Sequence, residues 1–347
     1  MIIPEEFLQQ ISMLPEPITL VLNDVSRPSQ VLYLSLLQQD LPDSTRILFA
    51  TGTHRAVTSA ERESLLGASF YRNFRMVSNN CDDGSHVYLG TTFRGTEVEF
   101  HPWVLEGSVV AINTVEPHYF AGYTGGRKSI LPGVSSRKTI EQNHFLACFP
   151  EAVVGKLQGN PVHEDMMEGV NFLTERRTLL MINGVRGSTN LFCGDYSKSF
   201  YKAVELTQLS AGRPVKKLYS SLEVRPGDSL EFSLYQAMKA VHLWESAVRD
   251  GGELILKASC PEGLGAKQMH RLLADSMETF NIPSSSVEYN LGDHAAIRIG
   301  RIRKRIRLSF NVGIDLTQYG FNTSSSECEV VVNNAGFCFP VMDLENA

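Results

Sequence analysis

Cysteines are few and scattered in this 347-residue chain. The six residues stand at positions 81, 148, 193, 260, 328 and 338 and form no C-x-x-C pair, so we expect neither a zinc cluster nor a disulfide framework. No apolar run reaches the length of a membrane span. The opening MIIPEEFLQQ lacks the basic and apolar regions of a secretory signal. These absences predict reduced thiols, a cytoplasmic location and no membrane partner.

An excess of charge of one sign is also missing. Hydrophobic residues make up 43% of the chain and charged residues 20%, and the formal net charge is −6. This balance is typical of a folded globular protein and lacks the basic character of a nucleic-acid binder. The basic run from Arg298 to Arg307 is expected to be the solvated face of a helix or an edge segment.

Apolar runs bounded by turn residues alternate with helical patterns in the first part of the chain. The runs span residues 18–24, 46–52, 108–114 and 178–184. Such alternation predicts an α/β fold with parallel strands. After the second run, Thr58 and Glu61 predict a capping box at the start of a helix, which Gly67 should close.

The helix after the first run is expected to be capped by Asp24 or Ser26, with Pro28 in its first turn. Its apolar face should run through Val31, Leu32, Leu34 and Leu37.

A second α/β pattern begins near residue 216. Strands are expected at 216–223, 253–259, 284–290 and 306–312, and a helix at 231–249. The length of the chain favours two domains. We therefore expect two α/β domains with mainly parallel sheets and an active-site cleft between them. The boundaries are 1–214 for an N-terminal cofactor-binding and catalytic domain and 215–330 for a C-terminal domain, with a tail at 331–347 that can pack back on the N-terminal domain.

Polar side chains follow the ends of three predicted strands. They are Asp24 and Arg27, Thr53 and His54, and Glu116 and His118. Ligands of open α/β sheets bind outside the carboxyl ends of the strands, so these three loops form a candidate site.

Two imidazoles and an amine surround a glycine-rich loop in the middle of the chain. The loop reads HYFAGYTGGRKS from His118 to Ser129, and His144 follows. Its glycines would let a ligand approach the backbone, and Lys128 can neutralise a phosphate or act as a nucleophile. The loop misses the P-loop spacing by one residue, which argues against an ordinary NTPase. It predicts a nucleotide-like cofactor.

A metal at His144 would need ligands from outside the protein. An imidazole can coordinate a metal, but no second His, Cys or carboxylate stands at the spacing of an ordinary zinc or iron site. This pattern again favours an organic cofactor.

Several segments together resemble the lactate racemase family, whose members carry a nickel-pincer nucleotide. The segments are DVSRP at 24–28, GTHR at 52–55, LGTTFRGT at 89–96, the block 116–144, GNPVHED at 159–165, GD at 194–195 and CPEG at 260–263. The block 116–144 is highly specific, and the resemblance covers most of the chain. It implies a racemase or epimerase of a 2-hydroxy acid.

The resemblance also implies a role for each candidate residue. The cofactor is the nickel complex of pyridinium-3,5-bisthiocarboxylic acid mononucleotide, covalently linked at Lys128. Hydride passes from the substrate to this cofactor and back through a 2-keto acid. The matching positions are His144 as nickel ligand, His54 and His118 as acid and base, Arg27 and Asp24 toward the substrate, and Thr124, Gly125, Gly126 and Ser129 in the cofactor loop. The implied partners are a small 2-hydroxy acid and the enzymes that synthesise the cofactor.

The chain departs from the family pattern in its second half. Many relatives have a lysine in a GGHK-like segment where this chain reads LGDHAA, with His294. The segment before LYQA is also altered, to GDSLEF from Gly227. These changes put lactate itself in doubt and leave the substrate and the oligomeric state open.

Two other functions remain as alternatives. A non-catalytic binder or carrier of the nucleotide cofactor would keep the pocket and lack turnover. A nicotinamide-dependent 2-hydroxyacid dehydrogenase would share the fold, but it predicts G-x-G-x-x-G after the first strand, and residues 24–28 contain no glycine.

Overall fold

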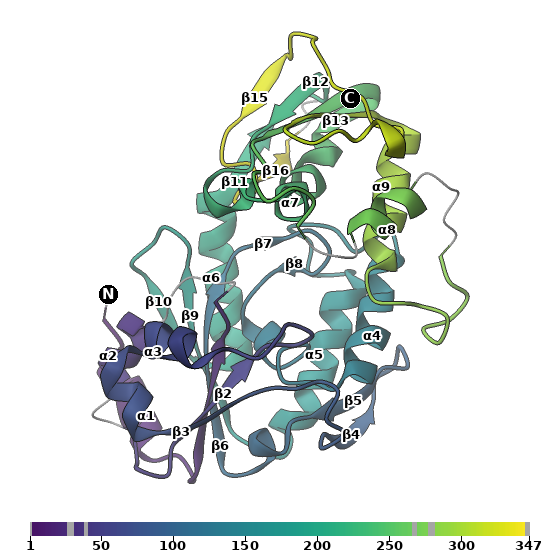
Figure 1. Ribbon diagram of the computed structural model, residues 1–347. Helices are drawn as coiled ribbons and strands as arrows, with labels where there is room; N and C mark the ends of the chain where they lie inside the picture. The colour runs from purple at the N-terminus through teal and green to yellow at the C-terminus, as the bar shows by residue number, and fades with distance from the viewer. Residues whose placement is uncertain (1, 26–30, 38–40, 266–268, 277–281, 344–347) are drawn as a thin grey trace. The chain divides into compact units, whose positions relative to one another are not determined.

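The computed structural model describes residues 2–25, 31–37, 41–265, 269–276 and 282–343. The chain forms two compact units. Unit 1 comprises residues 1–116, 123–143 and 157–207, and unit 2 comprises residues 117–122, 144–156 and 208–347. The chain therefore passes between the units several times. Figure 1 labels the elements, with colour running from purple at the N-terminus to yellow at the C-terminus.

Helices and strands alternate along most of the described chain. The helices are α1 (Glu5–Ser12), α2 (Val31–Leu37), α3 (Ser59–Asn73), α4 (Arg137–Phe145), α5 (Pro161–Thr174), α6 (Tyr196–Ala211), α7 (Leu234–Trp244), α8 (Met269–Asp275) and α9 (Asp293–Arg305). The first strands are β1 (Ile18–Asn23), β2 (Arg46–Ala50), β3 (Arg75–Ser78), β4 (Val87–Thr91), β5 (Glu97–Phe100), β6 (Ser108–Val115), β7 (Pro117–His118) and β8 (Gly122–Tyr123). The others are β9 (Leu179–Val185), β10 (Leu191–Asp195), β11 (Gly212–Val215), β12 (Tyr219–Val224), β13 (Val248–Ala258), β14 (Arg307–Val312), β15 (Val330–Val332) and β16 (Phe339–Met342).

Unit 1 is built on a six-stranded sheet in the order β10-β9-β6-β1-β2-β3. Its strands are parallel except β10, which runs antiparallel to β9 at one edge. All eight residues of β6 are buried, as expected for a central strand covered on both faces. The four apolar runs expected as strands in this part of the chain are β1, β2, β6 and β9, and their parallel pairing is confirmed.

The capping box of α3 is confirmed. The Thr58 side chain accepts a hydrogen bond from the Glu61 backbone, and the Glu61 carboxylate accepts one from Thr58 N at 2.8 Å. Gly67 has φ +76° and interrupts the helical backbone, but helical structure resumes and continues to Asn73. The expectation that Gly67 closes the helical segment that begins at Ser59 is therefore confirmed, and a second helical segment follows the kink.

The helix after β1 is α2, in which Leu34 and Leu37 are buried as expected. Its proposed cap Ser26 and first-turn Pro28 lie outside the described residues.

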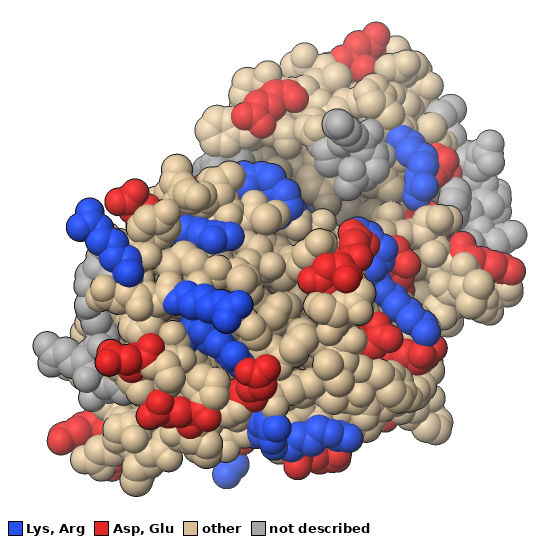
Figure 2. Space-filling model, turned by 60° about the horizontal axis from the view of Figure 1, so that its bottom comes forward, with Lys and Arg blue, Asp and Glu red and all other residues tan. Residues whose placement is uncertain are grey.

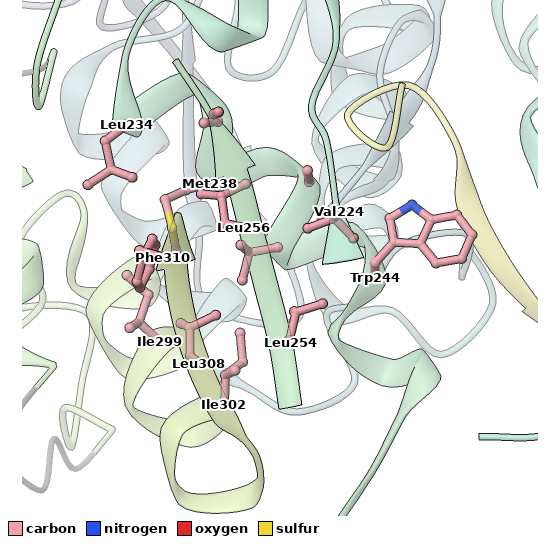
Figure 3. Packing of buried hydrophobic residues seen from close by; sticks show 14 of the residues in the cluster. Val224, Leu234, Met238, Trp244, Leu254, Leu256, Ile299, Ile302, Leu308 and Phe310 are labelled. Atoms are coloured by element: carbon pink, nitrogen blue, oxygen red, sulfur yellow. The ribbon is translucent and has the colours of Figure 1, made fainter. Parts of the chain in front are cut away.

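Unit 2 contains a second, four-stranded parallel sheet in the order β14-β13-β12-β15. Helices α7 and α9 bury Leu234, Met238, Ile299 and Ile302 against the sheet residues Leu254, Leu256 and Phe310, as Figure 3 shows. A short parallel pair joins β11 to β16. The mixed α/β class with mainly parallel sheets is thus confirmed.

Residues 284–290 do not form the expected strand. They make a turn in which the Ser284 side chain donates to Glu288 at 2.7 Å, while Val287 is 91% exposed and Tyr289 is buried. The strand expected from the sequence does not form, because a local hydrogen bond folds the segment back and leaves Val287 exposed.

The basic run is only partly solvated. It forms the second half of α9 and the start of β14. Arg298, whose side chain is 13% exposed, donates to the Ala152 carbonyl, and Arg301 donates to the Cys148 carbonyl at 2.6 Å. The expectation of a solvated face was therefore wrong for these two residues, because their guanidinium groups satisfy carbonyls of the 148–152 segment.

The surface carries charges of both signs. On the face drawn in Figure 2, Lys and Arg side chains are interspersed with Asp and Glu. Within the described ranges, no helix is long and apolar enough to cross a membrane.

The domain boundaries at 214 and 330 remain predictions, because a domain is defined by its capacity to fold alone. The contact of the tail with the N-terminal domain and the cleft between the domains remain predictions as well.

Candidate functional site

Asp24 and His54 meet at the carboxyl edge of the unit 1 sheet. Asp24 follows β1, and His54 follows β2, the neighbouring parallel strand. His54 Nδ1 lies 2.6 Å from Asp24 Oδ2, with the Asp24 side chain 9% exposed and the His54 side chain 62% exposed. An ionised carboxylate can only accept a hydrogen bond, so Nδ1 of His54 carries the hydrogen. In neutral His54, Nε2 is therefore unprotonated. This is the arrangement of an oriented general base.

The turn that carries His54 is fixed by the backbone. Gly52 has φ +53°, a left-handed conformation that favours glycine, and its N–H donates to the Gly133 carbonyl at 3.0 Å. His54 N then donates to the Thr51 carbonyl at 2.8 Å. These bonds connect the histidine turn to the segment that follows the glycine-rich loop.

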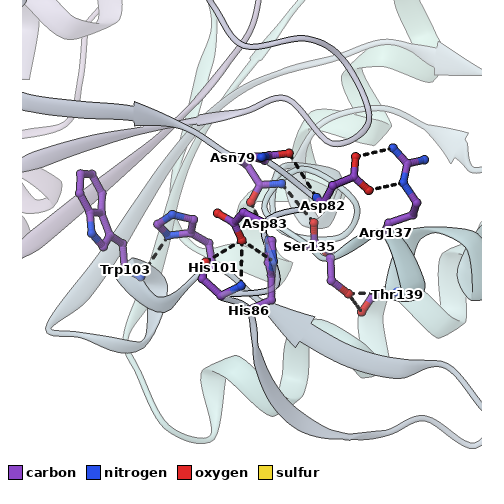
Figure 4. Close-up of polar contacts among 12 residues, drawn as sticks. Asn79, Asp82, Asp83, His86, His101, Trp103, Ser135, Arg137 and Thr139 are labelled. Atoms are coloured by element: carbon purple, nitrogen blue, oxygen red, sulfur yellow. Dashed lines mark hydrogen bonds and ion pairs between the residues drawn. The ribbon is translucent and has the colours of Figure 1, made fainter.

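A polar network in unit 1 supports the same region, as Figure 4 shows. Asn79 N donates to the Phe49 carbonyl of β2, and Asn79 Nδ2 donates to the Ser135 carbonyl at 3.1 Å. His86 Nε2 contacts Asn79 Oδ1 at 3.0 Å, and Arg137 at the start of α4 forms a two-point ion pair with Asp82. The loop after β3 therefore braces both the end of β2 and the approach to α4.

The glycines of the loop are required by packing within the chain. A Cβ on Gly125 would lie 2.8 Å from Val115 Cγ2, and one on Gly126 would lie 2.4 Å from Phe200 Cδ2. Both residues also have positive φ, at +71° and +53°. Sequence reasoning attributed these glycines to the approach of a ligand, whereas the Cβ directions point at the chain's own atoms.

Within the turn Gly126–Ser129, Arg127 is buried and Lys128 is half-buried. Arg127 donates to the Tyr123 carbonyl at 2.9 Å and lies over the Phe200 ring at 4.5 Å, and burial lowers its pKa to about 9. The Ser129 hydroxyl donates to Asn113 of β6, and the Gly126 N–H donates to Asn183 of β9 at 3.2 Å. The sheet thus holds the backbone that presents Lys128.

Thr124 closes the start of the same loop. Its hydroxyl donates to the Thr114 carbonyl at 2.9 Å and accepts from Glu116 N at 2.9 Å. Thr124 therefore holds the two ends of the turn that leaves β6, and Glu116 itself pairs with Arg186 at 3.2 Å.

In unit 2, His118 has the opposite tautomer to His54. The Ala121 N–H donates to His118 Nδ1 at 3.3 Å, so Nδ1 is an acceptor and neutral His118 carries its hydrogen on Nε2. The His118 ring stacks on Tyr119 with centroids 5.2 Å apart, and Tyr119 stacks on His242 at 4.8 Å. His118 is half-buried and keeps an accessible face.

His144, at the end of α4, also belongs to unit 2. It is part of a group of aromatic rings that we call the unit 2 cluster, formed by His118, Tyr119, Phe120, His144, His242, Tyr289 and His294. The His144 ring meets Phe120 edge-on at 5.1 Å and lies 6.0 Å from His294. Among the residues that the structure describes, no group of three or more His, Cys, Asp or Glu side chains is arranged to hold a metal ion. A metal at His144 would therefore find fewer than three such protein ligands among these residues.

The structure divides the candidate residues between the two units. Asp24, His54 and the loop from Thr124 to Ser129 belong to unit 1, whereas His118 and His144 belong to unit 2. Arg27 lies outside the described residues.

Sequence reasoning missed the part that three residues play in the unit 2 cluster. They are Tyr119, Tyr289 and His294, of which Tyr289 and His294 are buried and Tyr119 is half-buried. His294 was singled out only because a family lysine is absent near it. The neighbours of His118 in sequence were the available signal, since Tyr119 directly follows it.

Comparison with known proteins gives consistent matches. The family model of the lactate racemase N-terminal domain matches residues 3–155. A lactate racemase of Thermoanaerobacterium thermosaccharolyticum is 30% identical over 78% of this chain and 66% of its own length. A lactate racemase of Lactiplantibacillus plantarum is 29% identical over 74% of this chain and 63% of its own length. The chain thus spans just under two thirds of the length of these relatives.

Two solved structures have a similar fold. The lactate racemase apoprotein of Thermoanaerobacterium thermosaccharolyticum superposes with a TM-score of 0.82 and 26% identity, covering 98% of this chain and 82% of that one. A structural genomics protein of Thermotoga maritima superposes with a TM-score of 0.75 and 15% identity, covering 98% and 97%. At 15% identity the second match shows the fold alone.

Proposed function

We propose that this chain, which is similar to the lactate racemases, is an isomerase that interconverts the two configurations of a 2-hydroxy acid. The observation that carries the proposal is the 2.6 Å contact between His54 and Asp24 at the carboxyl edge of the sheet. A carboxylate-oriented imidazole is suited to remove a hydroxyl proton near neutral pH. The family match and the oriented base support the same chemistry.

His54 acts as the general base in this proposal. Its bare Nε2 takes the proton of the substrate hydroxyl, while Asp24 holds the ring in the required tautomer through Nδ1. Loss of the hydroxyl proton and of the C2 hydrogen, as hydride, converts the substrate to a planar 2-keto acid.

His118 acts as the second acid and base. Its Nε2 faces away from the Ala121 N–H that occupies Nδ1, so Nε2 is the atom that exchanges a proton with substrate. Two such groups are needed because the hydroxyl has a different direction in each enantiomer. We assign carboxylate binding to Arg27, because a guanidinium fork matches a carboxylate.

A nickel-pincer nucleotide is the proposed cofactor, and the residues present fit it. Lys128 offers a half-buried primary amine on a braced turn, suited to a covalent thioamide link, and His144 offers one imidazole to nickel. A cofactor that brings its own sulfur and carbon ligands needs only one from the protein. When bound, this group accepts hydride from C2 of the substrate and returns it.

The experiment is co-expression with the cofactor-synthesis enzymes, followed by chiral chromatography of 2-hydroxy acids and by nickel and intact-mass analysis. We expect racemisation, a covalent adduct and stoichiometric nickel in the wild type. His54→Gln should lower kcat by about 10²- to 10⁴-fold while keeping the adduct, because it removes only proton transfer. Lys128→Ala should lose the adduct.

His270→Gln is the matched control, because His270 contacts Tyr319 elsewhere in unit 2 and should keep full activity. Adduct and nickel without turnover of any acid would instead indicate a non-catalytic carrier. Absence of both adduct and nickel in the wild type would contradict the proposed cofactor.

A further inference from the structure

His294 is hydrogen-bonded by a tyrosine on each side of its ring. Tyr289 Oη lies 2.6 Å from His294 Nδ1, and Tyr119 Oη lies 3.1 Å from His294 Nε2. All three residues belong to unit 2. They form a chain of two hydrogen bonds, which we call the Tyr-His-Tyr relay.

The relay contains one hydrogen more than it uses. Two hydroxyls and one neutral imidazole carry three exchangeable hydrogens, whereas the two contacts of the relay need only two. Burial raises the pKa of both tyrosines, so each hydroxyl keeps its hydrogen. A protonated ring would add a further hydrogen. One hydroxyl therefore always has a hydrogen to donate outside the relay.

The contact of Gly292 with Tyr289 favours one of the two hydroxyls. Gly292 N donates to Tyr289 Oη at 3.4 Å, which favours Tyr289 as the donor of its own hydrogen to His294 Nδ1. His294 then carries its hydrogen on Nε2 and donates to Tyr119. The distances agree with this order, since O–H donors give shorter contacts than N–H donors. The surplus hydrogen therefore belongs to Tyr119.

The ring of Tyr119 packs against two histidine rings and one guanidinium group. His118 lies 5.2 Å away and His242 lies 4.8 Å away, both nearly parallel to it, and Arg298 lies over it at 5.8 Å. Tyr119 is half-buried and keeps accessible surface. Among the described residues, His294 is the one hydrogen-bond partner of the Tyr119 hydroxyl. The result is a donor with a fixed position beside the proposed acid and base, His118.

We propose that the Tyr119 hydroxyl is a substrate-binding group that donates its surplus hydrogen to an oxygen of the 2-hydroxy or 2-keto acid. This inference rests on the proposed function for the class of ligand. A donor that is already oriented loses little entropy when an anion binds, and a hydrogen bond to a charged acceptor is among the stronger ones. The relay supplies that orientation.

Tyr119→Phe is the sharpest test, because it removes the hydroxyl and retains the ring that packs on His118 and His242. We expect pyruvate, used as a non-chiral 2-keto acid probe, to bind about 10- to 100-fold more weakly in calorimetry. KM for the 2-hydroxy acid that the wild type racemises should rise by a similar factor, with a smaller change in kcat. Tyr319→Phe is the control, because it removes another tyrosine hydroxyl that contacts a histidine, His270, in the same unit. It should bind pyruvate as the wild type does.

A second measurement examines the relay without any ligand. In ¹⁵N-histidine NMR of the protein, His294 should show an unprotonated Nδ1 and a protonated Nε2. Tyr289→Phe should remove this preference. The reverse tautomer in the wild type would place the surplus hydrogen on Tyr289 and overturn the inference.

The outcomes separate this inference from the proposed function. Racemisation with an unchanged KM in Tyr119→Phe would overturn the inference and leave the function intact. Tyr119-dependent pyruvate binding without racemisation would support the inference and contradict the function. Reduced cofactor retention with unchanged pyruvate binding would mean that the hydroxyl contacts the cofactor, and it would overturn the assignment to substrate. No pyruvate binding by the wild type would overturn it as well.

Discussion

His54 and His118 are the same residue type, yet their surroundings prepare them differently. A carboxylate oxygen faces Nδ1 of His54, whereas a backbone N–H faces Nδ1 of His118. The neutral rings therefore carry their hydrogens on opposite nitrogens. Neither difference is visible in the sequence, because it depends on which atom each ring meets after folding.

Gly126 gives a prediction at the scale of one residue. Gly126→Ala should destabilise the protein by about 2–5 kcal/mol, because it adds left-handed backbone strain and a clash with Phe200. Urea unfolding measures this cost. Gly84→Ala is the matched control: it has a positive φ of +69° but meets nothing within 4 Å, so it should cost only about 1 kcal/mol. Equal costs would show that the clash with Phe200 is relieved.

At the scale of elements, the unit 1 sheet gathers groups that are far apart in sequence. The ends of β1 and β2 carry Asp24 and His54, while residues of β6 and β9 hold the glycine-rich loop. Parallel strands place their carboxyl ends at one edge, so the pattern of four apolar runs was enough to predict this gathering. It did not predict that asparagines of β6 and β9 would anchor the loop, because buried polar partners have no periodic signal.

Asp165 joins three elements and gives a prediction at this scale. This buried carboxylate on α5 accepts hydrogen bonds from Thr96 at 2.8 Å, from Asn143 of α4 at 2.8 Å and from Thr92. Asp165→Asn should lower the free energy of unfolding by about 1–3 kcal/mol, because an amide offers one acceptor oxygen instead of two. Hydrogen exchange at the 92–96 turn should also accelerate.

Asp195→Asn is the control for this change. Asp195 accepts from Ser197 N and Lys198 N at the exposed start of α6, where asparagine caps equally well. Its stability should change by less than about 0.5 kcal/mol. An equally small effect at Asp165 would mean that its network rearranges around the amide.

At the scale of the whole molecule, several histidines are held neutral by burial. Burial lowers the pKa of His101 to about 4 and that of His163 to about 3, and it also lowers the pKa of His86 and His242. The unfolded chain, with histidine pKa values near 6.5, therefore binds more protons than the folded chain below that pH. Stability should fall as the pH falls from about 6.5 toward 4.

Urea unfolding at a series of pH values tests this prediction. The unfolding midpoint should be nearly constant between about pH 7 and 8 and should decrease between about pH 6.5 and 5. Carboxylates with lowered pKa values, such as Glu61 at about 2, add to the loss only below the ordinary carboxyl pKa of 4.5. A constant midpoint down to pH 5 would show that the buried histidines are protonated without cost.

The sequence by itself determined the α/β class, the parallel strands of unit 1, the capping box of α3 and the resemblance to the lactate racemases. These follow from periodicity and local residue chemistry, which act over a few positions and can be read along the chain. Only the tertiary structure decided that residues 284–290 form a turn, that Arg298 and Arg301 bind carbonyls, and that Gly125 and Gly126 are required by packing. It also decided that Tyr119, Tyr289 and His294 form a relay. Apart from the local turn at 284–290, these features depend on contacts between residues separated by up to 175 positions, and such contacts exist only after the chain has folded.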